Sequence, residues 1–350
     1  MDAVALDAEL SMLADARSFS GVVRVDGPGG PWFAQAYGLA SPTWGVPCTL
    51  HTRFDTASIT KLFTAVATLQ QIEAGAFGLD TSVTGFLDLS GTQISPDVTP
   101  YHLLTHTSGI GDDADEEAGE RYEDLWVDTP NYSVTETRQI LPNFVNRAPN
   151  FAPGQGCRYC NCGYVLLGLM IEQATGQSYR DYVTDRVFAA AGMTRAGFFR
   201  MDVVEADVAE GADPILDADG NVTGWRRNIY SYPPIGSPDG GAHVTADDLM
   251  RFFAAVRNGR LLGSDSVQAM TTPKVRHSDR PPGEHLIGFG FEFETDAEGN
   301  VRSMWKEGIN VGASGMLRNY PSRDLTVVVL SNMEEGAWEP LRIIDRLVEI

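Results

Sequence analysis

The spacing of apolar positions predicts helices and strands in different parts of the chain. Apolar residues recur at helical spacing over residues 2–14 and 163–175, and Gly176 marks the end of the second stretch. Two apolar runs, 21–25 and 32–37, are separated by a short segment rich in Gly and Pro. We therefore predict a first helix, then two strands joined by a turn, and a longer helix near the middle of the chain.

Strand-like runs return only near the end of the chain. A helix is expected over residues 58–74, and residues from about 79 to 234 are mostly helices and loops broken by Pro and Gly. A last helix is expected over residues 338–348. The late strands are expected at residues 289–293, 314–319 and 325–330.

Strands at both ends of the chain that enclose a helical middle predict an α+β fold. Tight turns between strands favour one antiparallel sheet, completed by the two ends of the chain and flanked by the N- and C-terminal helices. A mostly helical lobe is then inserted beside the sheet. We place the sheet lobe at residues 1–78 plus 235–350 and the helical lobe at residues 79–234, with the active site between them.

Composition and charge narrow the partners that the protein can have. The chain has 350 residues, 43% of them hydrophobic, and no run approaches the roughly 18 apolar residues that a membrane-spanning helix needs. Its formal charge of −21 argues against nucleic acid or an anionic membrane as a partner. The acidic start lacks the features of a secretory signal, so we expect a cytoplasmic protein. The number of subunits is left open.

The four cysteines do not form a recognisable zinc motif. Cys157, Cys160 and Cys162 are clustered, and Cys48 lies far away. A structural zinc site usually takes its four ligands from two separated pairs, and no second pair has that spacing. We therefore expect free thiols, no metal and no cofactor.

Lysine is rare enough in this chain to be informative. Of the 26 Lys and Arg residues, only Lys61, Lys274 and Lys306 are lysines. Two of these three lysines end a Ser-x-x-Lys sequence. On the helix expected at 58–74, Ser58 and Lys61 lie on one face and can hydrogen-bond. Ser303 and Lys306 lie in a strand-like stretch, where positions three apart point to opposite faces. Only the first pair suits a nucleophile and its base.

Two further short motifs occur once each. Residues 159–161 are the only Tyr-x-Asn, and residues 306–308 are the only Lys-x-Gly. The order Ser-x-x-Lys, Tyr-x-Asn, Lys-x-Gly resembles serine β-lactamases and penicillin-binding proteins, and most closely the class C β-lactamase-like group with its esterases and D-amino-acid peptidases. Other segments similar to that group lie at residues 54–61, 103–109, 153–154, 163–168, 240–241, 247–249 and 327–332.

The third motif allows two placements. Many family members have His-x-Gly there, and counting from Gly315-Met316 would place the motif at residues 309–311. Counting back from Pro321 through Gly312, with the spacing usual in the family, favours Lys306. Glu307 then departs from the usual Thr or Ser, and an acid at that position is expected to repel the carboxylate of a β-lactam.

The resemblance implies a nucleophile and two candidate bases. Ser58 would be the nucleophile, activated by Lys61 or by Tyr159. Lys61 lies close to a second cation, Lys306, and should have a lowered pKa. Tyr159, flanked by both ammonium groups, should also have a lowered pKa, and it could protonate the leaving group.

The remaining residues of the motifs would bind the substrate. The backbone N–H groups of Ser58 and Ile309 would form an oxyanion hole. Asn161 would orient Lys61 or a substrate amide. Lys306 and Gly308 would complete the binding site.

The resemblance favours a serine hydrolase that acts on a small ester or amide. A true β-lactamase, with a lactam substrate, or a D-stereospecific peptidase is the alternative, and a non-catalytic binding protein on the same fold is a third hypothesis. The acidic segment 112–124 is either a solvated loop or a lid that prefers cationic substrates.

Overall fold

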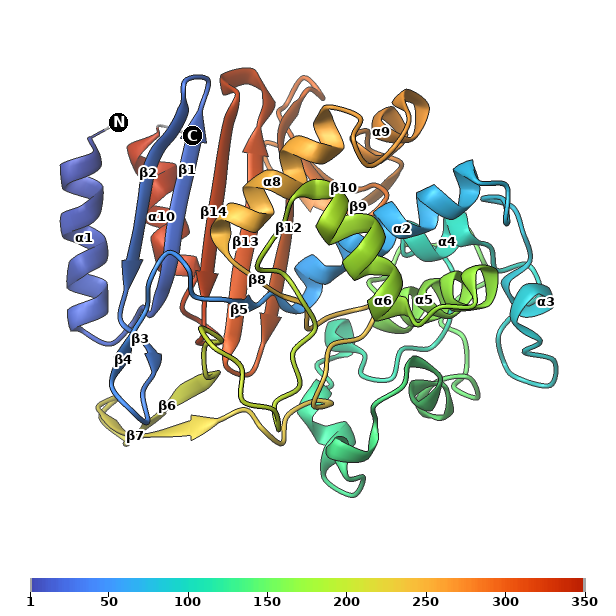
Figure 1. Cartoon of the computed structure of the whole chain (residues 1–350). Helices are drawn as coiled ribbons and strands as arrows, with labels where there is room; N and C mark the ends of the chain where they lie inside the picture. Colours follow the sequence, from blue (N-terminus) through green and yellow to red (C-terminus); the bar gives the residue numbers. More distant parts are fainter. Residues whose placement is uncertain (1, 349–350) are drawn as a thin grey trace.

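An antiparallel sheet dominates the computed structural model, which describes residues 2–348 (Figure 1). Within those residues, eight strands join in the order β2-β1-β14-β13-β12-β11-β10-β9, each antiparallel to its neighbours. The predicted α+β fold, with one antiparallel sheet completed by both ends of the chain, is confirmed. The strands are β1 (Gly21–Gly27), β2 (Gly30–Tyr37), β9 (Val275–Arg280), β10 (Gly283–Ile287), β11 (Glu292–Thr295), β12 (Val301–Asn310), β13 (Ala313–Tyr320) and β14 (Leu325–Ser331).

The two ends of the chain meet where β1 pairs with β14. Gly21 lies opposite Ser331 and Val25 lies opposite Val327, so two Val-rich strands run side by side. Alternate side chains point to opposite faces of a sheet. Val22 and Val328 accordingly belong to a different core cluster from Val25 and Val327, and β14 is buried along its whole length.

The outer face of the sheet is covered by the two terminal helices, α1 (Ala3–Asp15) and α10 (Trp338–Leu347), as Figure 1 shows. Asp2 caps α1 by accepting hydrogen bonds from the N–H groups of Val4 and Ala5. Leu6 and Leu10, one helical turn apart, are buried in the same cluster as the outward side chains of β14.

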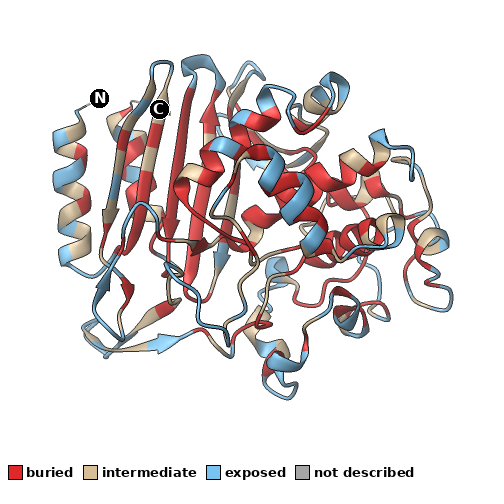
Figure 2. Ribbon diagram, in the orientation of Figure 1, coloured by how far each residue is buried: buried red, intermediate tan, exposed pale blue. Residues whose placement is uncertain are grey.

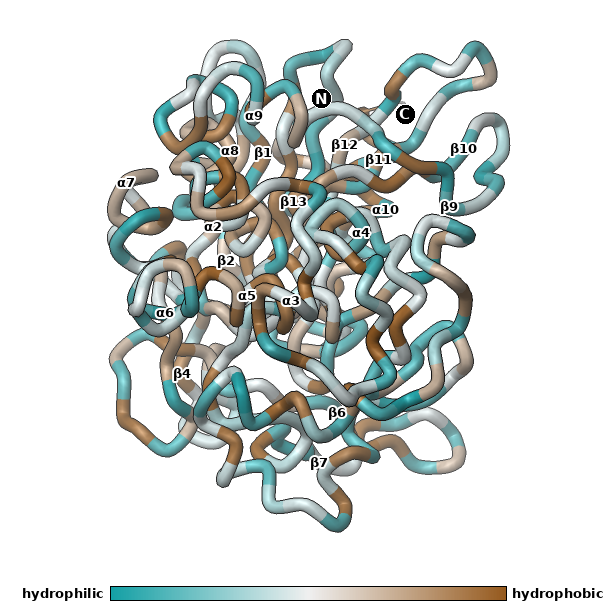
Figure 3. Tube along the Cα trace, turned by 90° about the vertical axis from the view of Figure 1, so that its right-hand side faces the viewer, coloured by the Kyte–Doolittle hydropathy of each residue, from teal (hydrophilic) through white to brown (hydrophobic). Residues whose placement is uncertain are grey.

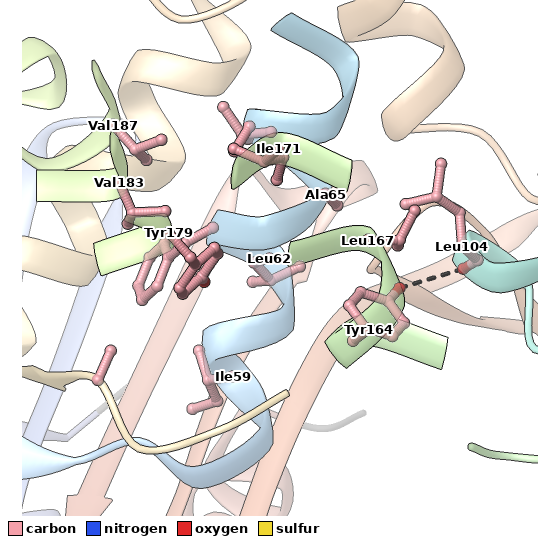
Figure 4. Close-up of a cluster of buried hydrophobic side chains, with 14 of the residues drawn as sticks. Ile59, Leu62, Ala65, Leu104, Tyr164, Leu167, Ile171, Tyr179, Val183 and Val187 are labelled. Carbon is pink, nitrogen blue, oxygen red and sulfur yellow. Dashed lines mark hydrogen bonds between the residues drawn. The ribbon is translucent and has the colours of Figure 1, made fainter. Parts of the chain in front are cut away.

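The inner face packs against a buried helix, α2 (Lys61–Glu73), with α5 (Asn161–Thr175) and α8 (Ala246–Arg257) around it (Figures 1 and 2). Ten of the thirteen residues of α2 are buried, Thr64 and Thr68 among them, so this helix is enclosed on all sides rather than on one. In Figure 4, Leu62 and Ala65 of α2 face Tyr164 and Leu167 of α5. The Tyr164 hydroxyl donates a hydrogen bond to the Leu104 carbonyl.

Shorter elements connect these layers. The hairpin of β6 and β7 lies at the lower edge of the molecule in Figures 1 and 3. The small strands are β3 (Leu39–Ser41), β4 (Val46–Pro47), β5 (Phe54–Asp55), β6 (Ala212–Leu216), β7 (Val222–Arg227) and β8 (His243–Val244). The short helices are α3 (Val83–Leu87), α4 (Pro100–Leu104), α6 (Tyr179–Val183), α7 (Ala189–Ala191) and α9 (Ser264–Met270), with 3₁₀ or π turns η1 (Ala57–Thr60), η2 (Glu116–Ala118), η3 (Tyr122–Trp126), η4 (Asn131–Ser133), η5 (Thr137–Asn143), η6 (Thr184–Phe188) and η7 (Pro321–Arg323).

Most predicted elements agree with the structure to within a few residues, but the strand predicted at 289–293 is wrong. Phe289 and Phe291 are buried there without alternation, and β11 begins only at Glu292. Gly290 has a positive φ of 85°, and a Cβ placed on it would lie 2.9 Å from Ala65, so this segment is a loop pressed against α2.

Strands β9 and β10 were not predicted because charged residues interrupt their apolar pattern. The lobe boundaries proposed from the sequence stay a prediction. Among the helices that the structure describes, none has the length and apolar character needed to cross a membrane. The expected cytoplasmic location also stays a prediction.

Candidate active site

Ser58 lies on the 3₁₀ turn η1 that leads into α2, not on the α-helix itself. The chain arrives from β5 and turns sharply at Ala57, whose φ of 42° is unusual for a residue other than glycine. The Asp55 carboxylate accepts a hydrogen bond from the Ala57 N–H at 2.7 Å and stabilises this turn. Ile59 is fully buried, so it anchors the turn while Ser58 keeps its hydroxyl at the surface of a cleft.

Lys61 is completely buried and donates three hydrogen bonds. Its Nζ lies 3.0 Å from the Ser58 Oγ, 2.7 Å from the Asn161 Oδ1 and 2.7 Å from the Asp239 carbonyl oxygen. Burial lowers the pKa of Lys61 to about 8, against the opposing charge of Asp239, and the positive charge of Lys306 lowers it further. The structure thus brings together the pair selected from the sequence, with the expected direction of the pKa shift.

Tyr159 lies between two ammonium groups, as expected. The Nζ of Lys61 is 5.0 Å and the Nζ of Lys306 is 4.7 Å from the centre of its ring. The ring of His106 lies 4.5 Å away. The two cations therefore contact the face of the ring.

The expected lowering of the Tyr159 pKa is wrong. Burial of the hydroxyl raises the pKa of Tyr159 well above its ordinary value, and the negative charges of Glu116 and Glu292 act in the same direction. A hydrogen bond with Ser58 opposes the shift without reversing it. The two ammonium groups were visible in the sequence, but the burial and the carboxylates that outweigh them were not. Tyr159 is therefore a neutral phenol near pH 7.

Asn161 connects the buried lysine to the acidic segment. Its side-chain oxygen accepts from Lys61, and its Nδ2 donates to the Glu116 Oε1 at 3.0 Å. The N–H of Tyr159 donates to the Glu117 Oε1 at 2.8 Å. The acidic segment therefore contacts the Tyr-x-Asn motif through Glu116 and Glu117, which are themselves exposed to solvent.

Asp112 holds the first turn of α5 in place. Its buried carboxylate accepts hydrogen bonds from the N–H groups of Asn161 and Cys162, each at 2.9 Å. Helix N-termini favour such carboxylates, because their first N–H groups lack partners within the helix. Asp112, Asp113 and Cys162 also have possible metal-ligating atoms within 4.8 Å of one another. Since both oxygens of Asp112 already accept backbone hydrogen bonds, we assign this group to helix capping.

The third motif lies on β12, directly behind Ser58. A Cβ placed on Gly308 would lie 2.1 Å from the Thr56 carbonyl oxygen and 3.0 Å from the Ser58 nitrogen, so only glycine fits. Ile309 follows at the cleft and is 40% exposed. Lys306 is buried under Tyr159. This placement favours residues 306–308 over 309–311 for the motif.

The expected effect of Glu307 on a substrate carboxylate is also wrong. Glu307 pairs across the sheet with Met316, whose side chain lies in the outer-face cluster with α1 and α10. It lines a groove on that side together with Arg318 and Trp338. Successive residues of a strand point to opposite faces, so Glu307 points away from the cleft that Gly308 approaches.

The cleft at Ser58 is acidic. Its described lining includes three carboxylate side chains, those of Asp55, Glu116 and Asp239, and no Lys or Arg side chain. Burial lowers the pKa of His243, so this residue adds no positive charge near neutral pH. The apolar and aromatic part of the lining is formed by Tyr122, Phe199, Met201, Tyr232, Ile235 and Ile309.

Several residues of the site were not selected from the sequence. The Nδ1 of His106 accepts the Cys160 N–H at 3.0 Å, and the ring of His106 supports Tyr159. Asp112 was only part of an acidic run, and Glu292 belongs to no motif. The similarity of residues 103–109 to a family segment was the one signal near His106. The four cysteines are free thiols in the structure.

Comparison with known proteins gives concordant results. The family described as "Beta-lactamase" matches residues 6–349. Penicillin-binding protein 4* of Bacillus subtilis (strain 168) is 28% identical, over 92% of this chain and 70% of that protein. Esterase EstB of Burkholderia gladioli is 31% identical, over 73% of this chain and 71% of that protein. The crystal structure of a penicillin binding protein from Bacillus halodurans matches with a TM-score of 0.88 and 35% identity, over 98% of this chain and 99% of that one.

Gly308→Ala tests the close approach of β12 to Ser58. The added methyl group would collide with the Thr56 carbonyl oxygen, so β12 or the Ser58 turn must move. A displacement of about 1 Å at a reacting group costs about 100-fold in rate, and we expect a loss of that size in the rate at which a fluorophosphonate probe labels Ser58. Gly29→Ala is the matched control, because nothing lies within 4 Å of its Cβ position. A Gly308→Ala protein that is labelled within about twofold of the wild-type rate would contradict the close approach of β12 to Ser58.

Proposed function

The chain belongs to the beta-lactamase family of serine hydrolases, and we propose that it hydrolyses a small ester or amide through an acyl-enzyme on Ser58. The observation that carries the proposal is the buried Lys61, hydrogen-bonded to the Ser58 Oγ at 3.0 Å. A serine hydroxyl needs a neighbouring base before it becomes a good nucleophile. An ammonium whose pKa falls to about 8 supplies a usable fraction of free amine near neutral pH.

In the acylation step, neutral Lys61 takes the Ser58 proton as the Oγ attacks the substrate carbonyl carbon. Negative charge develops on the carbonyl oxygen, and the N–H groups of Ser58 and Ile309 stabilise it. Tyr159, a neutral phenol, donates a proton to the leaving group and regains one from Lys61. Water then attacks the acyl-enzyme, and the same groups act in reverse. Asn161 keeps Lys61 oriented through its side-chain oxygen.

Within this scheme we infer that Lys61 is the base and Tyr159 is the acid. The directions of the two pKa shifts support this division, because the pKa of Lys61 is lowered and the pKa of Tyr159 is raised. Two titratable groups whose environments move their pKa values apart are suited to opposite roles.

Ser58→Ala tests the proposal directly. We expect p-nitrophenyl acetate turnover to fall at least about 1,000-fold, because the other two hydrogen-bond acceptors described at Lys61, the Asn161 side-chain oxygen and the Asp239 carbonyl oxygen, cannot act as nucleophiles in place of the Ser58 hydroxyl. A fluorophosphonate probe should label the wild type at Ser58, located by mass spectrometry. Ser303→Ala is a matched control, since Ser303 belongs to the second Ser-x-x-Lys but is buried on β12. Full activity of the Ser58→Ala protein would refute the acyl-enzyme scheme.

The pH dependence of kcat/KM tests the identity of the base. Lys61 must be unprotonated to accept the Ser58 proton, so activity should rise with pH through about 8. Lys274→Met removes a lysine that is far from the motifs in the chain, and it should leave the rise of kcat/KM with pH unchanged. A limb above about pH 10 would indicate a phenolate base, and activity independent of pH from about 6 to 10 would exclude a lysine base.

The charge of the cleft favours a second, narrower proposal about the substrate. Three carboxylates and no basic side chain line the described cleft, and Glu116 keeps one oxygen available beside Asn161. A cationic substrate would therefore be attracted to the site. This supports the interpretation of the acidic segment as a lid that prefers cationic substrates. It also supports a substrate whose acyl group carries an ammonium, as in an amino-acid ester or amide. Rapid turnover of nitrocefin would instead support the β-lactamase alternative.

Glu116→Gln tests the preference for a cation. We expect the KM for p-nitrophenyl glycinate to rise about fivefold, while the KM for p-nitrophenyl propionate, with a methyl in place of the ammonium, stays constant. Gln keeps a hydrogen-bond acceptor for Asn161, so the loss is one of charge. Glu120→Gln is the control, because Glu120 lies in the same segment but pairs with Arg147. An equal change for both substrates would refute the preference.

A further inference from the structure

Lys306 is paired with a buried carboxylate beside the active site. Its Nζ lies 2.5 Å from the Glu292 Oε1, and the two residues are only 1% and 6% exposed. The second oxygen of Glu292 is 2.7 Å from the His285 Nε2. The His285 ring in turn stacks on Trp305 at 5.4 Å. Both oxygens of Glu292 are thus engaged, and the carboxylate is held from two strands besides its own.

The Glu292 carboxylate is ionised under ordinary conditions. Burial alone would raise the pKa of Glu292, but the charge of Lys306 and the hydrogen bond from His285 hold that pKa well below its usual value. A buried ion pair with complete hydrogen bonding keeps both charges and exerts little net field at a distance. Lys306 therefore presents no free positive charge to the cleft.

A substrate carboxylate would find no cation in this cleft. Lys306 is absent from the described lining, and the three ionisable acids that are present would repel an anion. Glu307 takes no part, because it faces the other side of the sheet. The discrimination against anions then depends on Glu292, since Lys306 lies only 4.7 Å from the Tyr159 ring and its charge would otherwise reach the site.

We propose that Glu292 is a specificity-determining residue, which excludes carboxylate-bearing substrates by neutralising Lys306 and holding it beneath Tyr159. The inference rests on the proposed hydrolase site at Ser58. It narrows the substrates to neutral or cationic esters and amides. Glu292 contacts neither the substrate nor Ser58 in this scheme and acts through Lys306.

Loss of the Glu292 charge should abolish the preference for uncharged ligands over carboxylates. In Glu292→Gln, Lys306 is a buried ammonium without a counter-ion, which is an unfavourable state. A ligand carboxylate in the cleft becomes the nearest available counter-charge for it, acting across the Tyr159 ring. The variant should therefore gain affinity for anions, which a purely structural role of Glu292 would not produce.

The experiment compares binding of phenylacetate and phenylacetamide by calorimetry, in a Ser58→Ala background that prevents turnover. Ser58→Ala protein should bind phenylacetamide about tenfold more tightly than phenylacetate. Adding Glu292→Gln should tighten phenylacetate binding about tenfold and leave phenylacetamide unchanged. Adding Lys306→Met as well should abolish that gain, because the neutral pair again offers no cation.

Glu294→Gln is the matched control, since Glu294 lies on the same strand but faces Arg302 at 3.6 Å, and it should behave like the background. Phenylacetate binding as tight as phenylacetamide binding in the background alone would overturn the proposal, even if Glu292→Gln failed to fold. An unchanged ratio in a folded Glu292→Gln protein would also overturn it. Neither result depends on turnover, so failure of the hydrolase proposal would be seen separately, in the labelling of Ser58.

Discussion

The burial of the Lys61 ammonium is the constraint on which the rest of the active site depends. A buried charge is very costly unless it is fully hydrogen-bonded, so three acceptors must converge on one nitrogen. The acceptors come from η1, from the first residue of α5 and from the loop at Asp239, which are far apart in the sequence. Each of those segments is therefore fixed in position by the need to satisfy one ammonium group.

The supporting residues follow from that requirement. Asn161 can accept from Lys61 only if the start of α5 is rigid, and the Asp112 carboxylate secures it through two backbone N–H groups. From the other side, β12 approaches the Ser58 turn so closely that Gly308 has no room for a side chain. The sheet and the helices thus define the position of Ser58 from two independent directions, which is the kind of support that catalytic geometry requires.

How much could be predicted from the sequence depended on how local each feature is. Ser58 and Lys61 are three residues apart, so a single helical turn predicted their contact. The two-residue periodicity of the strand around Lys306 places Glu307 on the opposite face from Lys306 and Gly308, so the orientation of Glu307 is also a local feature. Glu292 and Asp112 could not be found in this way, because their partners lie 14 and 49 residues away in the chain. Strands β9 and β10 were not predicted because charged residues interrupt their apolar pattern. Their place in the sheet comes from pairing with each other and with β11.

Tyr159 illustrates why charge counts alone mislead. Two lysines beside a tyrosine suggest a phenolate, yet each lysine has its own compensation: Lys306 has Glu292, and Lys61 has the dipoles of Asn161 and of the Asp239 carbonyl. Little positive potential is then left over to stabilise an oxyanion on the ring, while burial penalises that oxyanion fully. The phenol stays protonated for this reason, and the amine with the lowered pKa is left as the group that can accept the Ser58 proton. In the scheme that we propose, the division of acid and base between the two residues is thus set by the partners of the cations, not by the cations themselves.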